Sequence, residues 1–259
     1  MSSIYIIGDS FTAGAELIDH TFASYNKFKP TNLNEYVKWF SSKEHIAEIE
    51  YLGTNYNKSY GERFRAWPAK LAALTNLEVI NSAFGGSSPE MWRSIILKEF
   101  IDFKKYDRKM DIAIIQFTNF NRVSLPSFKN GILIHNNMSG YSMEYGSEDE
   151  KRYYKARLMI QNDSGFFYTF LLDLASIKMT LNHFGVKTVK FVMSQIPALP
   201  EINEYAKIND IKILLDFLEI NFDTIPTLQH DNVIRLPGGH YTEETHELFA
   251  QKIKDLLKL

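Results

Sequence analysis

Cysteine is absent from this chain of 259 residues. Its absence excludes disulfide bonds, catalysis by a thiolate and zinc sites built from cysteine, and it leaves the redox compartment open. Long hydrophobic runs are absent too, because the most apolar segment, 166–175, contains Asp173 and is typical of a core helix. The first residues lack the basic and apolar segments of a signal peptide. We therefore expect a soluble, cytoplasmic protein with no membrane partner, although assembly into a virion would leave no mark on the sequence.

An excess of charge of either sign is lacking as well. The 29 Lys and Arg residues nearly balance the 31 Asp and Glu residues, for a net charge of -2, so nothing electrostatic favours nucleic acid as a partner. No His-Glu-x-x-His motif or carboxylate cluster predicts a metal site, and neither glycine-rich loop has the spacing of a phosphate-binding loop. We therefore expect no metal and no other cofactor, and a nucleotide-binding domain is disfavoured.

What the sequence does contain is an alternation of short apolar runs with helical patterns. Hydrophobic residues make up 45% of the chain, which is enough for a substantial core. Five runs have the length and composition of buried strands: 4–7, 77–80, 112–117, 188–193 and 233–236. This order is typical of a parallel sheet with helices on both faces. We predict one domain over residues 1–259, a three-layer α/β/α sandwich around a five-stranded, flavodoxin-like parallel sheet.

Helical spacing of apolar residues predicts the helices between these strands. One begins near Ala66, a second begins at Pro89, and a third ends at Gly185. The last runs from Thr242 to the end of the chain, with Leu256 among the residues expected to face inward.

Two stretches, 16–60 and 122–163, do not fit this repeat and are predicted to be long insertions. The first is aromatic and rich in Asn, with a short helix expected over 34–40, and the second is rich in Asn, Ser, Gly and Tyr. Loops of this length in a compact domain are usually functional or disordered. Their aromatic residues favour an ordered lid, edge or contact surface, in which they form local core more often than a sugar-binding platform. Contacts within a homo-oligomer or a virion would use these insertions.

A serine stands where the first strand ends. The strand is followed by Gly8-Asp9-Ser10-Phe11-Thr12-Ala13-Gly14, and in an open parallel sheet the functional crevice lies at the carboxyl ends of the strands. Three further loops reach the same edge: 81–89, with Gly85-Gly86; 116–122, with side-chain amides; and 237–242, with His240. A nucleophile, donors for an oxyanion and a base are therefore expected to converge there.

This pattern resembles the SGNH hydrolases, also called the GDSL lipase/acylhydrolase superfamily. The block 8–14 is similar to the first motif of that family, and Asn81 with Gly86 is similar to the second. Asn119 is similar to the third motif, whose usual Gly-x-Asn-Asp is Phe-Thr-Asn-Phe here, and His240 before a terminal helix is similar to the last. The resemblance spans the chain except for the insertions. Domains with long insertions and a Pro-Gly-Gly-His ending resemble those encoded by phages.

The resemblance implies a serine esterase or acylhydrolase. Ser10 would attack the carbonyl carbon of a small acyl or acetyl ester, including one on a carbohydrate, and His240 would take its proton. The N–H groups of Ser10 and Gly86 and the side chain of Asn119 would form the oxyanion hole. Asp9 would stabilise the turn and would not act as the acid.

One position departs from the family. The Asp expected three residues before the histidine is Pro237. Asp231 would lie about 16 Å away at the wrong edge of the sheet. Glu243, Glu244 or a backbone carbonyl could orient His240 instead. A Ser-His dyad is therefore one hypothesis.

The other hypothesis is a catalytically silent SGNH domain that binds a glycan or a protein, or that forms part of a virion. The missing Asp and the aromatic insertions motivate it.

Each candidate residue also has a structural interpretation. Ser10 and His240 could cap turns, Gly86 could be only a tight-turn glycine, and Thr118 or Asn121 could replace Asn119. Two further residues are expected to play no catalytic part. Arg122 is predicted to be a solvated or paired arginine rather than a site for an acidic substrate group. His246 is predicted to be exposed on its helix.

Overall fold

A computed structural model describes most of the chain. The described residues are 3–14, 17, 19, 22–48, 65–84, 87–117, 120, 122–129, 132–138, 147–194, 199–228, 235–237 and 239–259. At Ser10, and in most of the hairpin over 123–138, the description covers the backbone and not the side chain.

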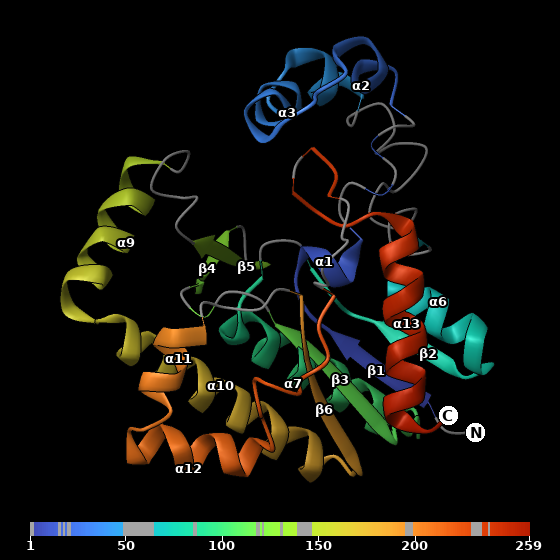
Figure 1. Ribbon diagram of the computed structural model, residues 1–259, viewed down its shortest axis with the longest axis vertical. Coiled ribbons are helices and arrows are strands. Elements are labelled where there is room, and N and C mark those ends of the chain that lie inside the picture. Colours follow the sequence, from blue (N-terminus) through green and yellow to red (C-terminus); the bar gives the residue numbers. More distant parts are fainter. Residues whose placement is uncertain are drawn as a thin grey trace.

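A parallel sheet forms the centre of the molecule (Figure 1). Its strands are β1 (Ser3–Ile7), β2 (Glu78–Asn81), β3 (Ile112–Phe117) and β6 (Thr188–Met193), in the order β2-β1-β3-β6. All five residues of β1 are buried, because helices cover both faces of the sheet and leave no polar side to the strand. The parallel sheet is confirmed, but four strands, not five, are described. Residues 233 and 234 of the predicted fifth strand lie outside the described residues, and Thr227 forms a single parallel bridge with Met193 beside β6.

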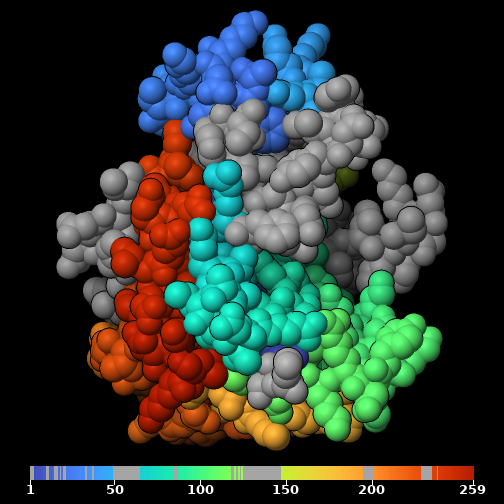
Figure 2. All heavy atoms as spheres, turned by 90° about the vertical axis from the view of Figure 1, so that its right-hand side faces the viewer, coloured from blue at the N-terminus to red at the C-terminus, as the bar shows by residue number. Residues whose placement is uncertain are grey.

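Two helical layers complete the sandwich. On one face, α6 (Trp67–Thr75) and α13 (Glu243–Leu257) pack against Ile4, Ile6 and Ile114, and Figure 2 shows these two helices side by side. The other face is covered by α7 (Pro89–Lys105), α10 (Asp163–His183) and α12 (Asn209–Leu218), with α11 (Leu199–Tyr205) at its edge (Figure 1). The alternation of side chains along β1 thus builds one core on each face.

The predicted helix ends agree closely with the structure. Pro68 lies in the first turn of α6, Pro89 begins α7, and Gly185 follows α10 with a φ of 90°. Leu256 was expected to face inward and is 40% exposed, because it lies in the last turn of α13, beyond the edge of the sheet. None of the described helices is long and apolar enough to cross a membrane.

The first insertion contains α2 (Ala23–Phe28), α3 (Leu33–Phe40) and a further helical turn over 43–48, which Figure 1 places above the carboxyl edge of the sheet. Trp39 is fully buried against Phe22, and its Nε1 donates to Ser24 Oγ at 3.0 Å. Phe22 and Trp39, with Tyr25 and Tyr36 packed against them, therefore form a local core, as predicted, whereas Phe28 and Phe40 are exposed.

The second insertion was expected to be ordered, but no strand or helix was predicted in it. It contains an antiparallel hairpin, β4 (Val123–Lys129) with β5 (Ile132–Met138), and the helix α9 (Glu148–Ile160). The polar run 147–150 begins the helix because Ser147 and Glu150 form a reciprocal capping box. The alternation of apolar and polar residues that predicts a strand is weak in this hairpin, because Asn and Ser residues, which are also common in loops, stand among the apolar ones.

Candidate active site

The serine-bearing turn is closed tightly at the end of β1. Ser10 begins the short helix α1 (Ser10–Ala13), and the Ala13 N–H donates to the carbonyl oxygen of Asp9 at 3.0 Å. A Cβ at Gly8 would overlap the hydroxyl of Thr12 and lie 2.9 Å from the carbonyl oxygen of Gln116. Position 8 therefore requires glycine, because any side chain there would clash with these atoms. The turn brings Ser10 to the carboxyl edge of the sheet.

A buried polar network lies beneath this turn. Gln116 Oε1 accepts from Thr12 Oγ1 at 2.6 Å and from Trp67 Nε1 at 2.5 Å. Asn81 Nδ2 donates to the carbonyl oxygen of Thr12 at 3.2 Å, while its Oδ1 accepts from the N–H of Ala83 at 3.1 Å. Sequence reasoning missed the role of Gln116. The available signal was a single polar side chain within the apolar strand β3, where an unpaired amide would be costly.

The loop after β2 is tied to the same turn. The N–H of Phe84 and the hydroxyl of Ser87 both donate to the carbonyl oxygen of Gly8, at 3.1 and 2.9 Å. Trp92 Nε1 in turn donates to Ser87 Oγ at 2.7 Å. Gly86, the predicted oxyanion donor, lies outside the described residues. Phe84 and Ser87, the nearest described residues before and after it, both bind the carbonyl oxygen of Gly8, two residues before Ser10.

Asp9 is 1% exposed and forms an ion pair with Arg122, with 2.9 Å between Oδ2 and Nη1. The prediction that Arg122 is a solvated or paired residue is confirmed, and the partner is the buried carboxylate beside Ser10. The two residues are 113 positions apart, so no local pattern could have identified this contact.

His240 lies in a tight turn that leads into α13. Arg235 and Tyr241 form an antiparallel bridge, and the N–H of Leu236 donates to the carbonyl oxygen of His240 at 2.7 Å. Gly239 has a φ of 94° and donates its N–H to Leu236, a backbone conformation that favours glycine. The imidazole of His240 is partly buried at this turn.

Arg235 holds the residues on both sides of His240. Its Nη1 donates to the carbonyl oxygen of Gly239 at 3.2 Å, and its Nη2 donates to Tyr241 Oη at 3.3 Å, with the guanidinium 5.0 Å from the ring centre. Tyr241 Oη donates to the carbonyl oxygen of Ser194 at 2.9 Å. Burial raises the pKa of Tyr241, and the charge of Asp9 raises it further against the lowering effect of Arg235. The neighbours of Ser10 and of His240 therefore interact electrostatically.

The two glutamates that could have oriented His240 have other partners. Glu243 binds Lys70 at 2.5 Å and Arg65 at 3.4 Å. The pKa of Glu244 is lowered by its own backbone N–H and by the hydroxyl of Thr242. These contacts compete with His240 for the two carboxylates, so either of them as the orienting group stays a prediction, and Pro237 occupies the position of the usual acid. A backbone carbonyl as the orienting group stays a prediction.

His246 was expected to be exposed, and this was wrong. It is 1% exposed, and its Nδ1 accepts from the N–H of Trp67 at 3.1 Å. Burial lowers its pKa to about 3, with further lowering by the charges of His240 and Lys70. The signal in the sequence was its spacing of three from Phe249, which places both residues on the inward stripe of α13.

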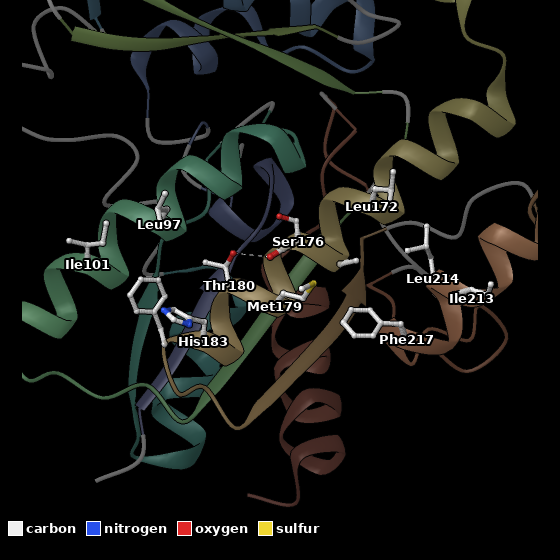
Figure 3. A pocket seen from close by; sticks show the side chains of 12 residues that line it. Leu97, Ile101, Leu172, Ser176, Met179, Thr180, His183, Ile213, Leu214 and Phe217 are labelled. Atoms are coloured by element: carbon white, nitrogen blue, oxygen red, sulfur yellow. Dashed lines mark hydrogen bonds between the residues drawn. The ribbon is translucent and has the colours of Figure 1, made fainter.

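Several predicted site residues cannot be placed. Asn119 and its alternatives Thr118 and Asn121 lie outside the described residues, as does Gly86. In the described ranges, no group of three His, Asp or Glu side chains could hold a metal ion. A groove of about 800 Å³ lies elsewhere, between α7, α10 and α12, and is lined by apolar side chains such as Leu97 and Met179 (Figure 3). It lies on the face of the sheet opposite α13.

Neither a protein-family model nor a curated protein matches this sequence. Solved structures match it along nearly its whole length. A family two carbohydrate esterase from Clostridium thermocellum, solved as an active-site mutant, is 12% identical with a TM-score of 0.50, over 99% of this chain and 64% of that longer chain. A protein assigned to the G-D-S-L lipolytic family from Desulfitobacterium hafniense is 12% identical with a TM-score of 0.46, over 99% of both chains. The esterase EstA from Pseudoalteromonas sp. is 11% identical with a TM-score of 0.45, over 100% of this chain and 97% of that one.

The fold is that of the SGNH hydrolases, an α/β sandwich whose structural neighbours include esterases, lipases and carbohydrate esterases. At 12% identity, the likeness defines the architecture, whereas activity depends on the residues at the site.

Proposed function

We propose that this protein is a serine esterase or acylhydrolase that cleaves a small acyl or acetyl ester, with Ser10 as the nucleophile and His240 as the base. The observation that carries the proposal is the meeting of two tight turns at one sheet edge. One turn begins α1 at Ser10 after β1, and the other, at His240, is attached through Tyr241 Oη to the carbonyl oxygen of Ser194, directly after β6.

In the proposed reaction, the Ser10 hydroxyl oxygen attacks the ester carbonyl carbon while His240 takes the hydroxyl proton. The negative oxygen of the tetrahedral intermediate is held by the N–H groups of Ser10 and Gly86 and by the side chain of Asn119. Collapse breaks the bond to the alcohol, which leaves with the proton from His240. Water, activated by the same imidazole, then releases the acid and restores Ser10.

The substrate class follows from the same site. Pro237 stands in the position of the usual acid, and loss of that acid from a triad costs up to roughly 10⁴ in turnover, which favours reactive small esters over amides. The chain shares its fold with a carbohydrate esterase, so acetylated carbohydrates are the first natural carriers to test. Asp9 is assigned a supporting role, because it holds the turn and pairs with Arg122.

Labelling with a fluorophosphonate probe tests this proposal. We expect the purified protein to be labelled, to hydrolyse p-nitrophenyl acetate, and to lose both properties in Ser10→Ala and His240→Ala. Ser176→Ala and His183→Ala are matched controls, since both residues line the groove on the other face (Figure 3). Labelling of the Ser10→Ala variant at the wild-type level would refute the assignment of the nucleophile.

A catalytically silent binding domain is the second candidate, and Pro237 in the acid position is the observation that favours it. It predicts a folded protein that is not labelled and that still binds a glycan or protein ligand. Calorimetry with acetylated and deacetylated xylo-oligosaccharides separates the two cases, because an esterase converts the first ligand during the titration.

A further inference from the structure

We propose that Arg122 is a positioning residue that holds the nucleophile turn in place through its ion pair with Asp9. The functional part of this inference rests on the proposed esterase activity. Its structural part concerns only the ion pair with Asp9 and the turn that this pair holds.

The energetic basis is a buried carboxylate with one described cationic partner. Asp9 is 1% exposed, and the side chain of Arg122, at 2.9 Å, is 21% exposed. Removing one member of a buried ion pair leaves the other charge desolvated and uncompensated, which costs far more than removing both. The contact therefore holds Arg122 beside the turn, since separation would remove this counter-charge from a buried carboxylate.

The geometric basis is that the loop after β3 has an anchor at each end. At its start, the carbonyl oxygen of Phe117 accepts from the N–H of Ser194 at 3.0 Å, within the parallel pairing of β3 with β6. At its end, Arg122 binds Asp9. Asn119 comes two residues after the first anchor and three before the second. The ion pair thereby attaches the residue that ends this segment to the turn that carries Ser10.

The same pair also attaches the second insertion. Val123, the residue after Arg122, begins β4, and β4 packs against α7. A second arginine of the insertion, Arg157 on α9, lies 3.9 Å from Glu90 on α7 and lines the same small cavity as Arg122. The hairpin and α9 are thus joined to the core by two arginines, of which only Arg122 reaches the nucleophile turn.

The experiment compares three changes at the pair with one matched control. Arg122→Gln removes the cation, Arg122→Lys keeps the charge without the planar fork, and Asp9→Asn with Arg122→Gln removes both charges. Arg93→Gln is the control, because Arg93 forms a 3.0 Å pair with a similarly buried carboxylate, Asp173, on the other face. Each variant is measured by fluorophosphonate labelling rate, by kcat and KM for p-nitrophenyl acetate, and by hydrogen exchange of residues 8–14.

We expect Arg122→Gln to lower the labelling rate and kcat by roughly tenfold to a hundredfold with little change in KM. Arg122→Lys should recover part of this loss, and the double variant should recover most of it. Exchange of the Ala13 N–H should accelerate in Arg122→Gln and stay at the wild-type rate in Arg93→Gln. If Arg122→Gln matches Arg93→Gln in both kinetics and exchange, the positioning role is overturned.

The two proposals fail in different ways. A wild-type protein that is not labelled refutes the esterase, and the exchange of Ala13 then decides the positioning role alone. If Arg122→Gln does not fold, Arg122→Lys and the double variant are compared with wild type instead. Exchange of the Ala13 N–H at the wild-type rate in both variants, together with kinetics that differ between the two variants, would contradict the role of the charge pair.

Discussion

His246 makes the stability of this fold depend on pH in a definite direction. The imidazole is buried between α13 and α6, and burial, with the charges of His240 and Lys70, lowers its pKa from 6.5 to about 3. Unfolding restores the ordinary pKa of His246. Between pH 6.5 and about pH 3, this imidazole therefore binds a proton in the unfolded chain but not in the folded protein. Stability is therefore fully present above pH 6.5 and is lost as the pH falls toward 3.

The size of the effect follows from these pKa values. At pH 7.5 the residue contributes almost nothing, whereas at pH 5.0 protonation of the unfolded chain costs roughly 2 kcal/mol of stability. Asp173 acts in the opposite direction, because burial raises its pKa from 3.8 to about 6. Its folded form takes up a proton as the pH falls through 6, which adds about 1 kcal/mol by pH 5.0 after allowance for solvent screening. The two residues together should lower wild-type stability by only about 1 kcal/mol.

A variant isolates the contribution of the histidine. Gln in place of His246 does not titrate, and its amide oxygen can still accept from the Trp67 N–H. Urea unfolding gives the free energy of unfolding of both proteins at pH 7.5 and at pH 5.0. The value for wild type, relative to that for His246→Gln, should be lower at pH 5.0 than at pH 7.5 by roughly 2 kcal/mol. His183→Gln, which changes an exposed histidine on α10, is the control and should follow wild type.

Equal pH dependence in wild type and His246→Gln would refute this reasoning. It would mean that the folded protein admits the proton at His246, and that the helix α13 tolerates an imidazolium against α6. NMR titration of the His246 ring gives an independent check, since its resonances should not shift between pH 8 and 4.5.

Three further results are expected. Gly8→Ala should destabilise the fold by about 3 kcal/mol in urea unfolding, because its methyl group would overlap Thr12, and an unchanged midpoint would contradict the tight turn. Asp173→Asn should raise stability by about 1 kcal/mol at pH 7.5 and by much less at pH 5.0, since it removes a buried charge that is neutralised at the lower pH. Arg235→Gln should lower kcat for p-nitrophenyl acetate roughly tenfold at unchanged KM, because it releases both neighbours of His240, and a KM effect alone would argue for a substrate contact.

Elements with strong local patterns were predicted well. The runs 4–7, 112–117 and 188–193 are strands, and the helices that begin at Pro89 and end before Gly185 have the expected bounds. Continuous apolar runs and helical stripes reflect burial on both faces of a sheet, which is a property of neighbouring residues in the chain. The second insertion was missed because its hairpin and capping box depend on polar residues that are equally common in loops.

Contacts between distant residues could not be predicted in the same way. The sequence placed His246 on a helix but did not show that α6 would cover it. It offered Glu243 as a neighbour of His240, whereas Lys70 and Arg65 on the adjoining segment neutralise that carboxylate. In both cases the outcome depended on which side chains a second helix brings alongside.

By itself, the sequence determined the four described strands of the parallel sheet, several of the helices between them, the glycine-flanked serine after the first strand, and the absence of an acid three residues before the histidine. These features depend on residue type and on spacing along the chain. Only the tertiary structure decided that Arg122 pairs with Asp9, that Gln116 supports the nucleophile turn, and that Arg235 clamps the histidine turn. The contacts of Arg122 and Gln116 join residues far apart in sequence, and those of Arg235 depend on how the turn before α13 folds, so the partners are chosen by packing and by the cost of burying an unpaired charge.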